Sequence, residues 1–304
     1  MTSSRELSRL RVLEALYRHP GSTRAELARR SGLSRPTVTA FVEELARAGL
    51  VRDAADDAGA RPHGRPPARL SLAPRAGFAV GIDVGHQHIR VALCDLAGTP
   101  VATDWSPAQV DHAPEASLDL VRELVTGLLR DAGVNRDRVL GAGMALAAPL
   151  ERGTGAVHVQ GFLPGWVGLR PGRELERRLG LSVTVQNDAN VGALGEKVFG
   201  AGRGVDDLVY VRLSAGIGAG LILGGRPYEG TGGLAGELGH VLADPEGLIC
   251  RCGNRGCLET VASPVAVAAL LERSRGEPVD EQRLLALVRA GDRGAVRAVE
   301  DAAR

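Results

Sequence analysis

The sequence predicts an α/β protein in two parts, an N-terminal winged helix-turn-helix within residues 1–72 and an α/β domain over residues 78–304. Two observations lead to this division. Three short helical patterns and two short strands fill the first part, whereas strands alternate with helices from residue 78 onward. Residues 73–77 contain proline and glycine and read as a linker between the two parts.

Length and composition set the class of protein. A chain of 304 residues suits two or three domains, and 24% charged residues are ordinary for a globular protein. The most apolar run, residues 208–223, contains Arg212 and several glycines and alanines, which favours sheet over a membrane span. Residues 1–6 are polar and contain no signal-peptide core, so we expect a cytoplasmic protein without membrane association.

The charge is distributed unevenly. Residues 1–70 contain 13 arginines and 8 acidic residues, whereas the rest of the chain has 24 basic and 28 acidic residues. A basic head on a mildly acidic body fits a polyanionic partner at one end of the chain. Chance variation in surface charge is an equally good explanation of this pattern alone.

The head shows the order of elements of a winged helix-turn-helix. Apolar residues recur at helical spacing over residues 5–18, and Thr23 with Glu26 forms a capping box before the next helix. A Ser-Gly-Leu-Ser turn follows, and Ser34 caps a third helix with Pro36 in its first turn. Strands near residues 50–52 and 68–72 complete the wing.

The third helix carries the candidate DNA readers. Its polar face and first turns offer Ser34, Arg35, Thr37 and Thr39, positions from which a recognition helix contacts bases and phosphates. The wing adds Arg61, Arg65 and Arg69. The alternative is a three-helix module that binds protein and whose charges are merely solvated. The basic balance and the arginine-rich wing favour double-stranded DNA, bound as a homodimer at a palindromic operator.

Three cysteines within eight residues predict a metal site in the second part. His240, Cys250, Cys252 and Cys257 supply four nitrogen or sulfur ligands, as a closed structural zinc site over residues 240–257 requires. Gly253 and Gly256 allow the chain to wrap tightly round the ion. The alternative, three free thiols and an unrelated histidine, fits the tight spacing poorly.

Carboxylates beside this cluster suggest recognition of hydroxyl groups. Glu237 precedes His240 by three residues, and Glu259 follows Cys257 by two. Asn187 and Asp188 stand between a strand and a helix, where α/β domains place ligands and where a carboxylate accepts a hydroxyl proton. Alternatively, Asp188 only caps the helix, and each glutamate is a solvated surface charge.

Together these segments resemble the ROK (repressor, open reading frame, kinase) family, specifically its transcriptional regulators. The motifs that carry the resemblance are Leu163–Trp166, Asn187–Asn190 with Glu196, Gly216–Gly220, Gly236–His240 and Cys250–Glu259. It covers about residues 5–270, including the winged head.

The resemblance implies a two-lobed, actin-like (ribonuclease-H-type) sugar-kinase-like fold. It also implies that Asn187, Asp188, Glu237, His240 and Glu259 bind sugar hydroxyls, with Asp188 as catalytic base in members that phosphorylate. His240 and the three cysteines would hold zinc. Residues Gly85, Gly216 and Gly218 would lie at the phosphates of a nucleotide.

The chain departs from the pattern of the family's kinases at three places. Asp83 to His88 reads Asp-Val-Gly-His-Gln-His, without the second glycine and the threonine of the first phosphate hairpin. Leu150 follows Pro149 where those kinases have glycine. No strand and Gly-Gly turn close an adenosine pocket before Arg304, so we expect a C-terminally incomplete domain and doubt binding of ATP and magnesium.

The leading hypothesis is a sugar-responsive transcriptional regulator, most often a repressor in this branch. An ATP-dependent sugar kinase with an accessory DNA-binding head is the alternative, and a zinc-stabilised interaction domain without a sugar ligand is the third. The five polar residues have no cationic partner among them, so a neutral hexose or a related sugar is the expected effector. A sugar phosphate is the weaker candidate unless an unassigned arginine lines the cleft.

Overall fold

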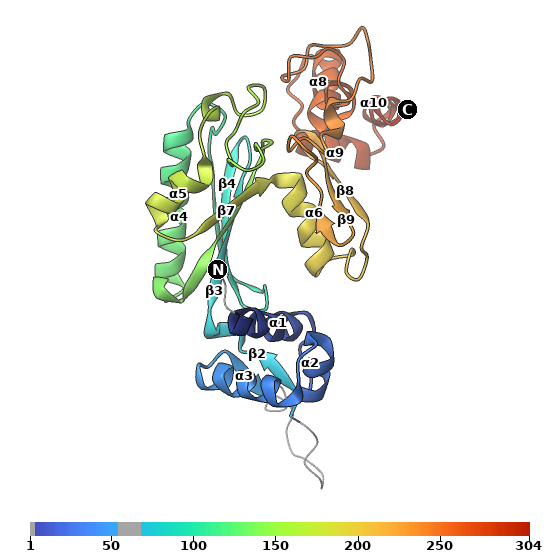
Figure 1. Cartoon of the computed structure of the whole chain (residues 1–304). Coiled ribbons are helices and arrows are strands. Elements are labelled where there is room, and N and C mark those ends of the chain that lie inside the picture. The colour runs from blue at the N-terminus through green and yellow to red at the C-terminus, as the bar shows by residue number, and fades with distance from the viewer. Residues whose placement is uncertain (1–3, 54–67) are drawn as a thin grey trace. The chain divides into compact units, whose positions relative to one another are not determined.

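The computed structural model describes residues 4–53 and 68–304 (Figure 1). These residues form two compact units. The first takes in the chain up to residue 81 together with residues 91–104 and 123–142, and the second contains residues 82–90, 105–122 and 143–304. No helix of the described residues is long and apolar enough to cross a membrane.

The head has the predicted elements in the predicted order. Helices α1 (Ser4–Arg18), α2 (Arg24–Ser31) and α3 (Arg35–Arg47) precede β1 (Val51–Asp53) and β2 (Leu70–Leu72), which pair antiparallel with Val51 opposite Leu72. One apolar core joins all five elements. Its buried residues are Val12, Ala15, Leu16, Leu27, Ala28, Val38, Phe41, Val42, Leu45, Val51 and Leu70.

Side-chain caps fix the two helices of the helix-turn-helix. The Thr23 hydroxyl accepts from the amide of Glu26, and the Glu26 carboxylate accepts from the amide of Thr23 at 2.7 Å. The turn between the helices passes through Gly32, whose φ of 68° is the left-handed conformation that glycine adopts without strain. Ser34 then caps α3 by accepting from the amide of Thr37 at 3.3 Å. The capping predictions are confirmed.

The first sheet of the second part has five strands in the order β5-β4-β3-β6-β7. A turn of 3-10 helix, η2 (Pro74–Ala76), replaces the expected irregular linker just before it. Two helices, α4 (Pro114–Asp131) and α5 (Pro171–Leu179), are inserted between strands, with the short turns η3 (Arg136–Arg138) and η4 (Pro164–Trp166). The strands are β3 (Phe78–Val84), β4 (His88–Asp95), β5 (Pro100–Pro107), β6 (Val139–Leu146) and β7 (Val183–Asn187).

The second sheet is a hairpin with a short third strand. Strand β8 (Leu208–Leu213) pairs antiparallel with β9 (Ile217–Leu223), which also pairs with β10 (Arg226–Pro227). Helix α6 (Asp188–Phe199) packs on this hairpin so closely that a side chain at Gly220 would meet the carbonyl oxygen of Ala189 at 2.2 Å. A strand–turn–strand hairpin is therefore present in both sheets, β3–β4 in the first and β8–β9 in the second.

Four helices follow the metal-ligand segment. Helices α7 (Leu258–Ala262), α8 (Pro264–Arg275), α9 (Glu281–Arg289) and α10 (Arg293–Ala302) come after the turn η5 (Leu238–His240). Helices α8, α9 and α10 share a small core around Val267, Leu271 and Leu284. Strand β5 was not predicted from the sequence, because most of its side chains are exposed and it has no alternating pattern.

Candidate functional site

A cavity of about 920 Å³ in the second unit collects the predicted polar residues. Strand β7 and the start of α6 bring Asn187 and Asp188 to its wall, η5 brings Glu237 and His240, and α7 brings Glu259. All five residues predicted to bind sugar therefore line one chamber, although they come from three places in the sequence. The volume falls in the range of small-molecule sites.

Glycines let the segment before His240 lie directly on strand β9. Gly236 has a φ of 95°, its carbonyl oxygen accepts from the amide of Ala219 at 2.7 Å, and an added Cβ would lie 2.0 Å from the Ala219 carbonyl oxygen. Gly239 approaches the carbonyl oxygen of Ile217 equally closely, at 2.2 Å. This contact holds Glu237 and His240 against the sheet and directs them into the cavity.

Burial and a neighbouring carboxylate raise the pKa of Glu237. Burial raises the pKa of Glu237 to about 7, and the negative charge of Glu259 adds to the shift. Glu259 itself accepts from the backbone amide of Ile217 at 3.0 Å, which fixes its carboxylate at the turn between β8 and β9. Two carboxylates held side by side in this way are suited to accept hydrogen bonds from several ligand hydroxyls.

The four predicted metal ligands converge on one point. The ligand atoms of His240, Cys250, Cys252 and Cys257 all lie within 4.8 Å of one another. The Sγ atoms of Cys252 and Cys257 are 3.6 Å apart, and Cys250 Sγ is 3.5 Å from His240 Nδ1. A tetrahedral zinc site with sulfur and nitrogen ligands has edges of about 3.6–3.8 Å, so the residues fit such an ion.

The chemistry of the donors agrees with that geometry. Burial raises the pKa of Cys257 to about 12 and also raises the pKa of Cys250, whereas burial lowers the pKa of His240. A bound metal ion would replace the protons of the thiols and stabilise them as thiolates. Neutral imidazole is the form of histidine that binds metal. Gly253 and Gly256, with φ of 91° and 67°, make the tight turns expected here. The cluster can hold a metal ion.

His240 connects the cluster to the cavity. Its Nδ1 faces Cys250, and its Nε2 lies 3.8 Å from a carboxylate oxygen of Glu237. The ring also packs edge-on against Phe162, which lines the cavity, with centroids 4.8 Å apart. The His240 imidazole therefore contacts both the cysteine cluster and the residues that line the cavity.

Two arginines accompany the five polar residues in the cavity. Arg212 in β8 donates to the Asp188 carboxylate, and Arg251 lies 3.8 Å from Glu259. Both arginines line the cavity. Sequence analysis missed them because an arginine on a strand or within a cysteine cluster has no distinguishing spacing, and their partners lie 24 and 8 residues away.

Asn187, not Asp188, caps helix α6. The Asn187 side-chain oxygen accepts from the amides of Ala189 and Asn190 at 2.9 and 3.3 Å. Asp188 is the first residue of the helix, and its Oδ1 accepts from the amide of Ala189 at 2.8 Å. The alternative explanation of Asp188 as the helix cap is therefore wrong, because its neighbour Asn187 caps the helix. The side-chain oxygen of Asn187 is already engaged in this cap.

Both histidines of the first hairpin face aspartates, one within the hairpin and one beyond β5. His88 Nε2 lies 3.0 Å from Asp83, and the His88 ring fills the space where a Cβ on Gly85 would be, at 2.4 Å. His86 Nδ1 lies 2.7 Å from Asp111. Gly85 thus lines the same cavity as Gly216 and Gly218 of the second hairpin, but a histidine ring covers it.

The head presents most of the predicted DNA readers. Arg35 is exposed, Thr39 is half-buried, and the hydroxyls of Ser34 and Thr37 lie 2.7 Å apart. Arg69 donates to the carbonyl of Gly21 at 3.1 Å. Arg61 and Arg65 lie outside the described residues.

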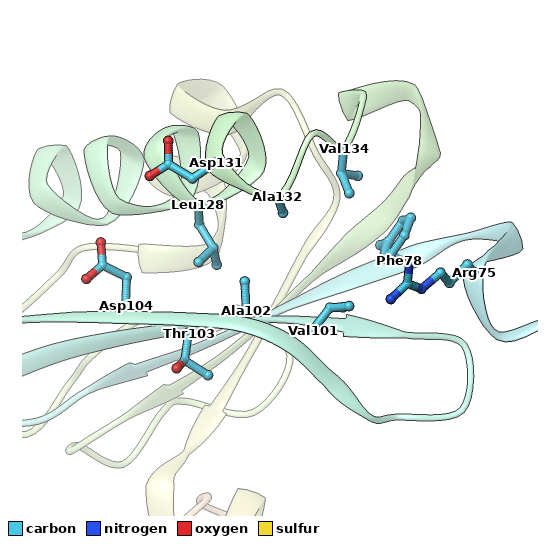
Figure 2. Close-up of a pocket in the computed structure, with 10 residues that line it drawn as sticks. All are labelled: Arg75, Phe78, Val101, Ala102, Thr103, Asp104, Leu128, Asp131, Ala132 and Val134. Carbon is cyan, nitrogen blue, oxygen red and sulfur yellow. The ribbon is translucent and has the colours of Figure 1, made fainter.

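A smaller pocket of about 540 Å³ lies in the first unit (Figure 2). Strand β5 and the end of α4 form its walls, with Phe78 and Arg75 at one end. Its charged lining residues are Arg75, Asp104 and Asp131. It contains none of the predicted site residues.

Comparison with known proteins agrees with this geometry. The ROK family profile matches residues 79–304, and a winged helix-turn-helix DNA-binding profile matches residues 5–52. The xylose repressor of Bacillus subtilis (strain 168) is 30% identical over 292 residues, which cover 95% of this chain and 74% of that protein.

Two solved structures are also similar. A ROK family transcriptional regulator, described as a homologue of the E. coli MLC protein, gives a TM-score of 0.76 at 28% identity, covering 97% of this chain and 76% of that one. A ROK family glucokinase from Streptomyces griseus, in complex with glucose and AMPPNP, gives 0.64 at 29% identity, covering 73% and 74%.

A DNA-binding head followed by an actin-like sugar-kinase fold with a polar cavity defines a transcriptional regulator that responds to a sugar. This chain belongs to the ROK family.

The importance of the close contact between Gly236 and strand β9 can be tested by mutation. We expect Gly236→Ala to destabilise the sugar-kinase-like domain by about 1–3 kcal/mol, because alanine strains a left-handed backbone and its Cβ overlaps the Ala219 carbonyl. Gly232→Ala is the matched control, since a Cβ there meets nothing within 4 Å. Thermal unfolding of both variants measures the effect, and equal midpoints would contradict this account of the loop.

Proposed function

We propose that this chain is a transcriptional repressor that binds a palindromic operator in double-stranded DNA as a homodimer and responds to a neutral sugar in its kinase-like domain. One observation carries the proposal. Five groups suited to sugar hydroxyls line one cavity of about 920 Å³, in a chain whose head is a winged helix-turn-helix.

The relatives supply the candidate ligands. The matched repressor is named for xylose, and the matched glucokinase was solved with glucose. Both are neutral sugars. The similarity to the repressor extends over 95% of this chain, head included, whereas the glucokinase covers 73%. A zinc-stabilised interaction domain without a ligand would have no use for a cavity of this size and polarity.

The two arginines do not turn the cavity into an anion site. Arg212 is paired with Asp188, and Arg251 lies near Glu259, so each positive charge already faces a carboxylate. Glu237 adds a further acidic group. A phosphorylated sugar would have to break these pairs and then face the released carboxylates, which favours a neutral ligand.

We further propose that the metal is a single structural zinc ion. His240, Cys250, Cys252 and Cys257 would complete its four ligands, which leaves no open position for chemistry. The ion would fix the orientation of the His240 ring through Nδ1, and Nε2 would remain for the cavity.

The kinase alternative has little support at the first hairpin. Phosphoryl transfer depends on backbone amides that approach the phosphates closely. Here the His88 ring covers Gly85, and Asp83 is engaged by that histidine. Asp188, which would serve as base, is engaged by Arg212.

Arg35 should read the operator. Replacement by alanine should cost about 1–3 kcal/mol of specific DNA binding and relax base choice at one position in each half-site. Selection from a random duplex library, followed by footprinting, measures both effects. Arg30→Ala, on α2, serves as a control for loss of charge. Unchanged affinity and site preference in Arg35→Ala would remove this residue from the readers.

Zinc should be bound at one ion per chain. Cys252→Ser should lose the metal, because it removes one of four ligands, and should lower the thermal stability of the domain. Cys94→Ser, outside the cluster, should keep the full zinc content. Elemental analysis of freshly purified, unchelated protein provides the measurement. Absence of zinc from the wild-type protein would refute the proposal.

Glu237→Ala should reduce the affinity for the sugar by roughly tenfold to a hundredfold, because each lost charge-assisted hydrogen bond is worth about 1.5–3 kcal/mol. Calorimetry with a panel of neutral sugars first identifies the best ligand and then compares the variant. Glu246→Ala is an exposed acidic control outside the cavity. An unchanged affinity in Glu237→Ala would show that the cavity is wrongly assigned.

The protein should transfer little or no phosphate from ATP. The expected rate of ADP release with the best-binding sugar, magnesium and ATP lies far below the kinase range of roughly 1–100 per second. Asp188→Asn distinguishes true turnover from contamination. Turnover within that range, abolished in the variant, would establish the kinase alternative.

A further inference from the structure

His86 lies between two charged side chains that come from distant parts of the sequence. Its Nδ1 is 2.7 Å from a carboxylate oxygen of Asp111, and its Nε2 is 3.3 Å from Nη1 of Arg251. A carboxylate accepts hydrogen bonds and a guanidinium only donates them, so Nδ1 must carry the hydrogen and Nε2 must accept. The two contacts thereby select one tautomer of the ring, and Asp111 orients that ring toward Arg251.

Arg251 extends this series of contacts to a residue of the proposed sugar site. Its Nε lies 3.8 Å from Oε1 of Glu259, and Oε2 of the same carboxylate accepts from the amide of Ile217 at 3.0 Å. The side chain of Arg251 is 43% exposed, whereas that of Glu259 is 15% exposed. Arg251 is therefore nearer to solvent than the carboxylate, whose other oxygen is held by the turn between β8 and β9.

Backbone contacts fix the segments that carry the two ends of this series. The amide of Gly165 donates to the carbonyl of Asp111 at 2.8 Å. A Cβ on Gly161 would lie 2.2 Å from the carbonyl oxygen of Arg251. The segment between these two glycines thus contacts both the strand extension that carries Asp111 and the cysteine loop (residues 250–257). The separation that His86 and Arg251 bridge is therefore set by the backbone.

The series is more than a set of separate surface ion pairs. An isolated exposed pair contributes little, because solvent and side-chain entropy oppose it. Here His86 is 25% and Asp111 35% exposed, and the two inner members, His86 and Arg251, each have a partner on both sides. The first partner restricts the side chain before the second contact forms, which lowers the entropy cost of that contact. The link also requires a side chain at residue 86, where the kinase pattern has glycine.

We propose that His86 and Arg251 are positioning residues of the sugar site, which tie the cysteine loop to the first hairpin and hold the Glu259 carboxylate for a ligand. Asp111 orients His86, His86 orients Arg251, and Arg251 restrains Glu259. Neither His86 nor Arg251 has to touch the ligand for this role. The inference rests on the proposed binding of a neutral sugar and adds the residues that preorganise one of its acceptors.

Calorimetry of the full-length protein with D-glucose and with D-xylose tests the inference. Arg251→Ala and His86→Ala should each lower the affinity for the tighter-binding sugar by roughly threefold to tenfold. The double variant should lose no more than the larger single effect, because the two residues act through one contact. His86→Gln, whose amide oxygen can still accept from Arg251, should retain more affinity than His86→Ala.

Arg255→Ala is the matched control. It removes an equal charge from the same cysteine loop, where Arg255 donates to the carbonyl of Gly247 at 2.8 Å and does not line the cavity. This variant should bind the sugar as tightly as the wild type. Thermal unfolding, measured alongside, establishes that each variant is folded.

The outcomes separate this inference from the proposed function. Unchanged affinity in folded Arg251→Ala and His86→Ala would overturn the positioning role and leave sugar binding intact. Additive losses in the double variant would overturn it as well, because the two residues would then act separately. If Arg251→Ala does not fold, the comparison of His86→Ala with His86→Gln decides, and equal losses in the two would count against the role. A wild-type protein that binds no neutral sugar would overturn the proposed function and this inference with it.

Discussion

The segment from Gly236 to His240 lies on strand β9 with no room for a side chain between the two backbones. Its glycines meet the carbonyl oxygens of Ala219 and Ile217, and this contact places Glu237 and His240 at the cavity. The metal-ligand cluster begins at the same histidine, so its geometry depends on the same contact. Cavity and cluster are thus built on one close approach of backbone to backbone.

His240 makes the two sites interdependent. His240 would hold an ion through Nδ1, which would fix the ring with Nε2 toward Glu237. The raised pKa of Glu237 reflects its burial beside Glu259, a cost that a ligand with several hydroxyls can offset by donating to both carboxylates. The cluster would therefore stabilise the arrangement that the sugar needs, without touching the sugar through its thiols.

Three acidic side chains around the cavity, or next to it, are paired with basic ones. Asp83 faces His88, Asp111 faces His86, and Asp188 faces Arg212. Each pair occupies a carboxylate that could otherwise bind a cation or accept a proton. Glu237 faces no arginine or lysine within the described part of the chain, which makes it the acceptor best placed for a ligand.

Local chemistry in the sequence determined much of this protein. Thr23, Glu26, Gly32 and Ser34 specify the helix-turn-helix, because caps and left-handed turns act over only a few residues. The metal-ligand cluster was predictable for the same reason, since three of its four ligands lie within eight residues. The hairpins and most strands followed from apolar patterns, whereas the exposed strand β5 gave no such pattern.

Tertiary structure alone decided which charges meet. Arg212 lies on β8 and Asp188 at the start of α6, and only the packing of that helix on the sheet brings them together. Arg251 likewise meets Glu259, and His86 meets Asp111 from 25 residues away, whereas His88 meets Asp83 within one hairpin. Charge pairing acts through space and leaves no periodic signal in the sequence. The polar residues that line the cavity could therefore be predicted, but the arginines paired with them could not.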